Sequence, residues 1–264
     1  MIRQRAAQKG LAGAVAGRRV RKSPVGRLLT AFLGVALLTV AIVPAAAANV
    51  DKVNVVPNVG HPFGKSYGSW SVAWWQYVLS QPTRSNPLTD PTGAGCGVAQ
   101  SGPVFFLVGT SGTGTASRDQ CVVPAGKALF FPVANAFDVH VPPDGLDTPK
   151  LVWNDLQVTL GLSFNSLHAT IDGVPVKHLS NVATSPYRAC AGPAEGCARS
   201  FALTFPADNF FGLKAGTYAP AVADGYYLLL PPLRPGKHTI SFGGAGYLNG
   251  DFSSDTTYHL TVKR

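Results

Sequence analysis

The sequence predicts a mainly β fold, a β-sandwich or jelly-roll-like domain with one or two packed helices. The first reason is composition, because the 264 residues include 29 glycines and 21 prolines and only 13% of them are charged. The second reason is a succession of short apolar runs, separated by turn residues, that continues to the end of the chain. Short strands joined by Gly- and Pro-rich turns are typical of sandwiches and barrels.

The N-terminal segment has the order of a secretory signal peptide. Eight Lys and Arg residues precede residue 28, an apolar run follows over residues 28–43, and Ala46 and Ala48 fit an A-x-A cleavage site. The apolar run is shorter than the roughly 20 residues of a membrane-spanning helix, so a retained anchor is the weaker alternative. We therefore predict a signal peptide over residues 1–48, cleaved near Ala48. Residues 49–264 are then a secreted or extracytoplasmic domain with no membrane span.

The signal peptide changes the meaning of the net charge. The whole chain carries 22 basic and 13 acidic residues, a formal charge of +9. Eight of the basic residues and none of the acidic ones precede residue 49, which leaves 14 basic and 13 acidic residues, a net charge of +1. Residues 49–264 contain no run of Lys or Arg, so the sequence argues against nucleic-acid binding.

Four cysteines, all in residues 49–264, predict disulfides in an exported chain. Four cysteines allow three connectivities, and proximity in the sequence favours Cys96–Cys121 and Cys190–Cys197. The alternative is a four-thiolate zinc site, but such sites prefer C-x-x-C pairs, and neither spacing fits.

The clearest helix is expected over residues 69–80, with Ser66 or Ser69 as its N-cap and Pro82 beyond its end. Three of the four tryptophans, Trp70, Trp74 and Trp75, lie in it. Apolar residues occupy two opposite faces of this helix, a pattern typical of burial on both sides. The alternative is that one or more of these tryptophans presents a flat face to a sugar ring or a partner protein.

The remaining elements are expected to be mostly strands. Residues 103–108 and 128–133 are apolar runs that predict buried strands, and residues 109–117 predict a flexible loop. Residues 146–164 are ambiguous, because Thr148-Pro149 resembles a helix start whereas residues 156–164 alternate with a period of two. We expect a helix early and a strand late in that segment. Alternation and an Asp172-Gly173 turn predict a hairpin over residues 167–176.

One constellation of polar residues predicts chemistry. Asp138, His140, Asp144 and Asp147 fall within ten residues, in a Pro- and Gly-rich loop that follows a buried strand. Carboxylate oxygens suit calcium, and an added imidazole suits zinc or another transition metal. The spacing matches no established metal motif, and the alternative is a solvated loop whose aspartates cap turns. No cofactor is otherwise expected.

Six motifs resemble those of a family of uncharacterised exported bacterial proteins, and they extend over nearly all of residues 49–264. They are Ser-Tyr-Gly-x-Trp at 66–70, Trp-Trp-Gln at 74–76, Pro-Ala-Gly-Lys at 124–127, Phe-Phe-Pro at 130–132, Ala-Asp-Gly-Tyr at 223–226 and Pro-Gly-Lys-His-Thr-Ile at 235–240. The resemblance implies a bacterial, exported protein. It implies no activity and no catalytic residue.

Two functional hypotheses follow from the residues. The first is a non-catalytic exported β-sandwich that binds a cell-envelope component, either a glycan or a protein. The second is a metal-dependent hydrolase centred on the loop from Asp138 to Asp147. The sequence favours the first, because it contains no recognisable nucleophile or acid–base set, and leaves open whether the protein is an enzyme.

Overall fold

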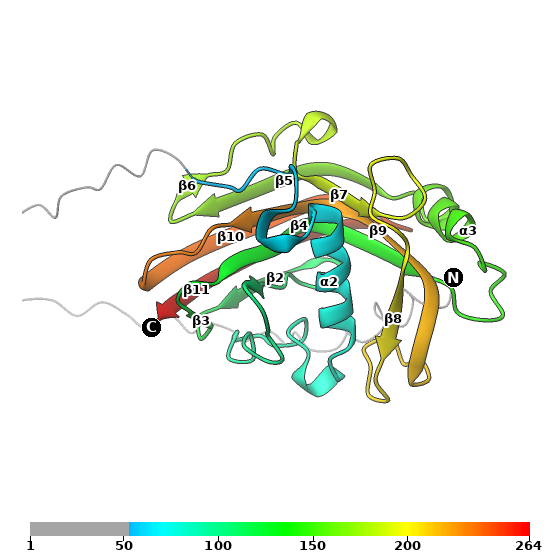
Figure 1. Ribbon diagram of the computed structural model, residues 1–264, viewed down its shortest axis with the longest axis horizontal. Coiled ribbons are helices and arrows are strands. Elements are labelled where there is room, and N and C mark those ends of the chain that lie inside the picture. Colours follow the sequence, from blue (N-terminus) through cyan, green and yellow to red (C-terminus); the bar gives the residue numbers. More distant parts are fainter. Residues whose placement is uncertain (1–52) are drawn as a thin grey trace, which may run out of the picture. The chain divides into compact units, whose positions relative to one another are not determined.

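Two β-sheets lie face to face in the computed structural model, which describes residues 53–264 (Figure 1). The first sheet has five strands in the order β1-β4-β9-β7, and β8 also pairs with β9. Its strands are β1 (Val104–Phe106), β4 (Ala128–Val139), β7 (Arg188–Ala191), β8 (Phe201–Phe205) and β9 (Gly216–Leu230). All its pairings are antiparallel except that of β1 with β4.

The second sheet has six strands in the order β2-β11-β10-β5-β6, with β3 also paired to β11. Its strands are β2 (Gly114–Arg118), β3 (Val122–Pro124), β5 (Ser163–Ile171), β6 (Val174–Pro175), β10 (Gly236–Tyr247) and β11 (Asp251–Lys263). Both β2 and β3 run parallel to β11. The predicted loop over residues 109–117 is therefore wrong in its second half, where β2 pairs with a strand about 140 residues further along the chain.

A shared apolar core fills the space between the two sheets. Alternate residues of β4 and β9 enter it from the first sheet, and alternate residues of β5, β10 and β11 enter it from the second. Phe131 and Phe242, one from each sheet, have ring centroids 4.7 Å apart. The predicted mainly β fold is confirmed, and this arrangement is consistent with a β-sandwich.

Helix α2 (Tyr67–Leu79) covers the outer face of the first sheet, as Figure 1 shows. The Oγ of Ser66 accepts a hydrogen bond from the backbone N–H of Ser69, so Ser66 is the N-cap. Such a cap stabilises a helix by about 1 kcal/mol. The helix predicted over residues 69–80 is confirmed, with a start two residues earlier.

The ambiguous segment 146–164 is helical for longer than its alternation suggests. Thr148 caps α3 (Pro149–Asn154), and a π-helical turn, η3 (Asp155–Thr159), continues it before β5 begins. The early helix and the late strand are confirmed, but the period-two pattern over residues 156–162 does not form a strand. Leu156 is fully buried against Val152 and Val222, so packing on the first sheet determines this helical turn.

The hairpin predicted over residues 167–176 is formed by β5 and β6, with Asp172 and Gly173 at positive φ. Three short 3₁₀ helices complete the described elements: η1 (Pro62–Gly64), η2 (Thr83–Ser85) and η4 (Val182–Thr184).

Both predicted disulfides are confirmed. Cys96 bonds to Cys121 and Cys190 bonds to Cys197, with Cα–Cα distances of 5.6 and 4.8 Å. No free cysteine occurs in residues 53–264. All four cysteines therefore form disulfides, and none is free to bind zinc as a thiolate.

The described part of the chain belongs to one compact unit. None of its helices is long and apolar enough to cross a membrane. The predicted signal peptide and its cleavage position near Ala48 lie outside the described residues.

Candidate functional site

A groove of about 650 Å³ opens along one side of the two-sheet stack. Its twelve lining residues come from both sheets, from η3 with Leu162 shortly after it, and from the segment around η4. On the first sheet β7 is an edge strand, and on the second β5 lies beside the short edge strand β6. The groove therefore lies between β7 and β9 of the first sheet and β5 of the second, and its volume is in the range of small-ligand sites.

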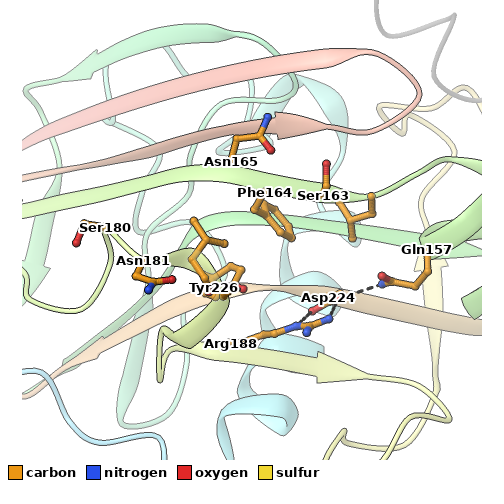
Figure 2. A pocket seen from close by; sticks show the side chains of 12 residues that line it. Gln157, Ser163, Phe164, Asn165, Ser180, Asn181, Arg188, Asp224 and Tyr226 are labelled. Atoms are coloured by element: carbon orange, nitrogen blue, oxygen red, sulfur yellow. Dashed lines mark hydrogen bonds and ion pairs between the residues drawn. The ribbon is translucent and has the colours of Figure 1, made fainter.

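An ion pair forms one wall of the groove (Figure 2). Arg188 on β7 and Asp224 on β9 lie diagonally across neighbouring strands, because Arg188 is in register with Tyr226 and Cys190 with Asp224. The guanidinium binds the carboxylate through two hydrogen bonds, Nε to Oδ1 at 3.0 Å and Nη2 to Oδ2 at 2.6 Å. Such two-point pairs are strong and directional.

The two members of this pair differ in exposure. The side chain of Arg188 is 54% exposed, whereas that of Asp224 is 2% exposed. Gln157 of η3 donates a further hydrogen bond of 3.0 Å from Nε2 to Oδ2 of Asp224. The hydrogen bond from Arg188 to Asp224 is the largest cause of the raised pKa of Arg188. The guanidinium therefore stays charged and faces the groove, with the carboxylate buried behind it.

Two aromatic residues from opposite sheets occupy the middle of the groove, as Figure 2 shows. Phe164 of β5 and Tyr226 of β9 pack edge to face, with ring centroids 5.3 Å apart. The hydroxyl of Tyr226 donates a hydrogen bond of 2.9 Å to the carbonyl of Val182 in η4. Burial raises the pKa of Tyr226, an effect that Arg188 partly offsets. Tyr226 thus ties the η4 segment to the first sheet and stabilises that wall of the groove.

Uncharged polar side chains border the aromatic pair. The lining also includes Ser163 and Asn165 of β5 and Ser180 and Asn181, just before η4. Amide and hydroxyl groups both donate and accept hydrogen bonds. The groove therefore combines apolar faces with donors and acceptors of both kinds.

One residue in the sequence indicates this groove, although we did not predict it: a single aspartate within a long apolar run. Residues 221–230 are all buried, and Asp224 is the one charged residue among them. Charged side chains are almost never fully buried without a partner, so its presence predicts a polar contact. Nothing local in the sequence identifies the partners, because Arg188 and Gln157 are 36 and 67 residues away.

The loop predicted to bind metal begins later than the sequence suggests. Strand β4 extends to Val139, so Asp138 belongs to a strand and is only 8% exposed. Its Oδ1 accepts a hydrogen bond of 2.8 Å from the N–H of Val139. The placement of Asp138 in a loop is therefore wrong, because β4 continues its pairing with β9 through this position.

The structure brings together two of the four residues predicted at this loop. Nδ1 of His140 lies 2.5 Å from Oδ1 of Asp144. The Asp144 carboxylate also accepts hydrogen bonds from the N–H groups of Val141 and Leu146, as expected of an aspartate that caps a turn. Asp147 is exposed. Within residues 53–264, no group of three or more His, Cys, Asp or Glu side chains is arranged to hold a metal ion.

The three tryptophans of α2 lie in the core. Trp70, Trp74 and Trp75 are 6%, 2% and 7% exposed. Nε1 of Trp74 donates a hydrogen bond to the carbonyl of Leu107, and the Trp75 ring packs against Phe137 at 4.5 Å. The structure supports the interpretation in which these three tryptophans belong to the core. Their ring faces are not available to a sugar ring or a partner protein.

Comparison with protein-family models gives no match, and neither curated proteins nor solved structures give one. The resemblance to a family of exported bacterial proteins therefore stays a prediction. The interpretation of the groove depends on its own geometry.

Proposed function

We propose that residues 49–264 form a non-catalytic binding module that works outside the cytoplasm of a bacterium and holds a glycan of the cell envelope in the groove. The observation that carries the proposal is the lining of the groove, in which Phe164 and Tyr226 are bordered by amide and hydroxyl side chains and by the guanidinium of Arg188. Sugar rings have apolar faces and a rim of hydroxyls. Such a ligand matches both parts of the lining.

Two further features support the extracytoplasmic part of the proposal. Disulfides persist in oxidising compartments and are rare in the cytoplasm, and both Cys96–Cys121 and Cys190–Cys197 are formed. The N-terminal sequence has the order of an export signal. A purified exported sample whose first residue is Asn49 is the expected result of N-terminal sequencing.

The hydrolase hypothesis is not extended into a proposal. It depended on metal ligands from Asp138 to Asp147. Of these residues, His140 and Asp144 are in direct contact, and the Asp144 carboxylate accepts hydrogen bonds from backbone N–H groups as in a turn.

Binding to isolated cell-wall glycan tests the proposal. The mature protein is mixed with purified bacterial cell walls, and the bound fraction is measured over a range of wall concentrations. We expect saturable binding that the double variant Asn165→Ala/Asn181→Ala weakens by about tenfold, because each amide contact contributes about 0.5–1.5 kcal/mol. Both residues are exposed, so the fold is expected to tolerate the change.

The matched control is Gln120→Ala, an exposed amide outside the groove. Gln120 lies between β2 and β3, and β2 is at the opposite edge of the second sheet from β5 and β6. We expect this variant to bind as the unmodified protein does. No saturable binding by the unmodified protein, or equal binding by all three proteins, would contradict the proposal.

A further inference from the structure

We infer that the groove takes an uncharged saccharide, and that Asp224 is the residue that excludes acidic ones by cancelling the charge of Arg188. This inference rests on the proposed glycan-binding function and deepens it by stating the charge class of the ligand. Arg188 and Asp224 are the only charged residues among the twelve that line the groove. The charge that a ligand meets is therefore determined by how these two side chains are arranged.

The arrangement neutralises the charge of the guanidinium but leaves it able to donate a hydrogen bond to a ligand. Both carboxylate oxygens of Asp224 accept hydrogen bonds from Arg188, at 3.0 and 2.6 Å through Nε and Nη2. In this side-on geometry Nη1 points away from the carboxylate. The formal charge of the pair is zero, while Nη1 remains available to a ligand oxygen because the Arg188 side chain is 54% exposed.

An acidic ligand gains little from such a site. A carboxylate at Nη1 would be attracted to Arg188 but repelled by Asp224 a few ångströms further away, and it would lose its own hydration on entry. A basic ligand would meet the exposed guanidinium first and be repelled. An uncharged hydroxyl accepts a hydrogen bond from Nη1 at a much smaller desolvation cost.

The rest of the lining has the same chemistry. The lining includes the amide residues Asn165 and Asn181 and the hydroxyl residues Ser163 and Ser180. Each of these groups can both donate and accept, as sugar hydroxyls do. The hydroxyl of Tyr226 already donates its proton to the carbonyl of Val182, so this residue offers a ligand its ring and an acceptor oxygen but no donor.

Calorimetry with matched tetrasaccharides tests the inference. The probes are a panel of neutral tetrasaccharides of different sugars, and for each one a uronic-acid and an amino-sugar counterpart of the same length. We expect at least one neutral probe to bind ten times more tightly than its charged counterparts. We also expect its affinity to change less than twofold between 50 and 500 mM salt, because no net charge is involved. The Debye length falls from about 14 to about 4 Å over this range, so an interaction between net charges would weaken.

Two variants separate the role of the charge from that of the hydrogen bonds. Asp224→Asn leaves Arg188 with a net positive charge, and we expect it to gain about tenfold in affinity for an acidic probe at low salt and to lose that gain at high salt. The double variant Arg188→Gln/Asp224→Asn restores neutrality, and we expect it to show no such gain. Thermal unfolding of each variant confirms that it is folded before binding is measured.

The outcomes distinguish this inference from the proposed function. Tightest binding of an acidic or basic probe, or an Asp224→Asn variant that is folded and gains nothing for acidic probes, would overturn the inference alone. No binding of any probe, together with no binding to cell walls, would overturn the proposed function as well.

Discussion

The guanidinium of Arg118 and the hydroxyl of Tyr258 lie 2.6 Å apart in the interior of the protein, between neighbouring strands β2 and β11. Arg118 is only 2% exposed. Its other hydrogen bonds go to backbone carbonyls of Val108, Gly109 and Asp90. The described hydrogen bonds thus place a buried cation among carbonyl groups. They join β2 to two connections, the segment before β1 that holds Asp90 and the segment between β1 and β2 that holds Val108 and Gly109.

Replacing Arg118 tests how much this junction contributes to stability. Arg118→Met keeps an apolar chain but removes the guanidinium that donates to three buried carbonyls and to the Tyr258 hydroxyl, so we expect a loss of about 3 kcal/mol in the free energy of unfolding. Tyr258→Phe removes one hydroxyl and is expected to cost about 1 kcal/mol. Urea unfolding followed by tryptophan fluorescence measures both. An Arg118→Met protein at least as stable as Tyr258→Phe would contradict this role.

A glycine on the outer face of the second sheet makes room for a cross-strand pair. Gly243 of β10 is in register with both His168 of β5 and Asp255 of β11, and Nε2 of His168 reaches over it to Oδ1 of Asp255 at 2.6 Å. A Cβ at Gly243 would lie 2.1 Å from the carbonyl oxygen of Ser254 and 2.9 Å from that same carboxylate. The position therefore has no space for a side chain.

We expect Gly243→Ala to lower the free energy of unfolding by about 1–3 kcal/mol, because the ladder between β10 and β11 must shift to admit the methyl group. Gly97→Ala is the matched control, since a Cβ there meets nothing within 4 Å. We expect that control to change stability by less than about 0.5 kcal/mol. Equal stability of the two variants in urea would show that the strands accommodate the added atom without cost.

Much of the fold could be predicted from local patterns, because several elements carry their own signals. The helix over Tyr67–Leu79 has a serine cap and a proline beyond its end, and the hairpin of β5 and β6 has an Asp-Gly turn. The disulfides follow from the proximity of their cysteines. Each of these features depends on residues that are close in sequence.

The features that we did not predict from the sequence depend on residues that are far apart in the chain. Residues 114–118 look like a loop, yet they form β2 by pairing with β11. The groove was not predicted because its charged wall joins Gln157, Arg188 and Asp224 from three distant segments. A single chain without pairing information cannot identify such partners. The buried position of Asp224 was the one local signal, and it indicates that something pairs with it but not which residue does.

The lowered pKa of Asp90 predicts that this residue stabilises the fold at neutral pH and loses that effect in acid. Burial alone would raise its pKa, but hydrogen bonds from the N–H groups of Thr92, Gly95 and Gly93 outweigh that effect, so the pKa of Asp90 is lowered. A lowered pKa means that the folded state prefers the carboxylate. Its contribution is therefore fully present above the unfolded pKa of about 3.9 and is lost as the pH falls through the lower folded value.

We expect Asp90→Asn to be less stable than the unmodified protein by about 1 kcal/mol at pH 7, because the amide nitrogen cannot accept hydrogen bonds from this loop. The difference is expected to shrink below pH 4 as Asp90 of the unmodified protein becomes protonated. Urea unfolding at pH 7, 5, 3 and 2 measures it. A difference that stays constant over this range would mean that the charge of Asp90 does not stabilise the loop.

The two disulfides are expected to contribute unequally to stability. Their cysteines are 25 and 7 residues apart, and the loss of chain entropy in the unfolded state grows with the size of the closed loop. Replacing Cys96 and Cys121 by alanine should cost about 3.5 kcal/mol, and replacing Cys190 and Cys197 about 2.5 kcal/mol. Urea unfolding of the two double variants measures this difference.

The shorter disulfide has an additional role, because Cys190 follows Arg188 by two residues on β7. We expect its removal to weaken the attachment of that edge strand, with faster amide hydrogen exchange at Ala189 and Ala191 than at Leu228 in the middle of β9. The Cys96–Cys121 variant serves as the control, because its disulfide does not involve β7 and should leave those two amides protected. A larger loss of stability from the 190–197 pair would show that loop closure does not govern the two contributions. Unchanged exchange at Ala189 and Ala191 would show that this disulfide does not hold β7 in place.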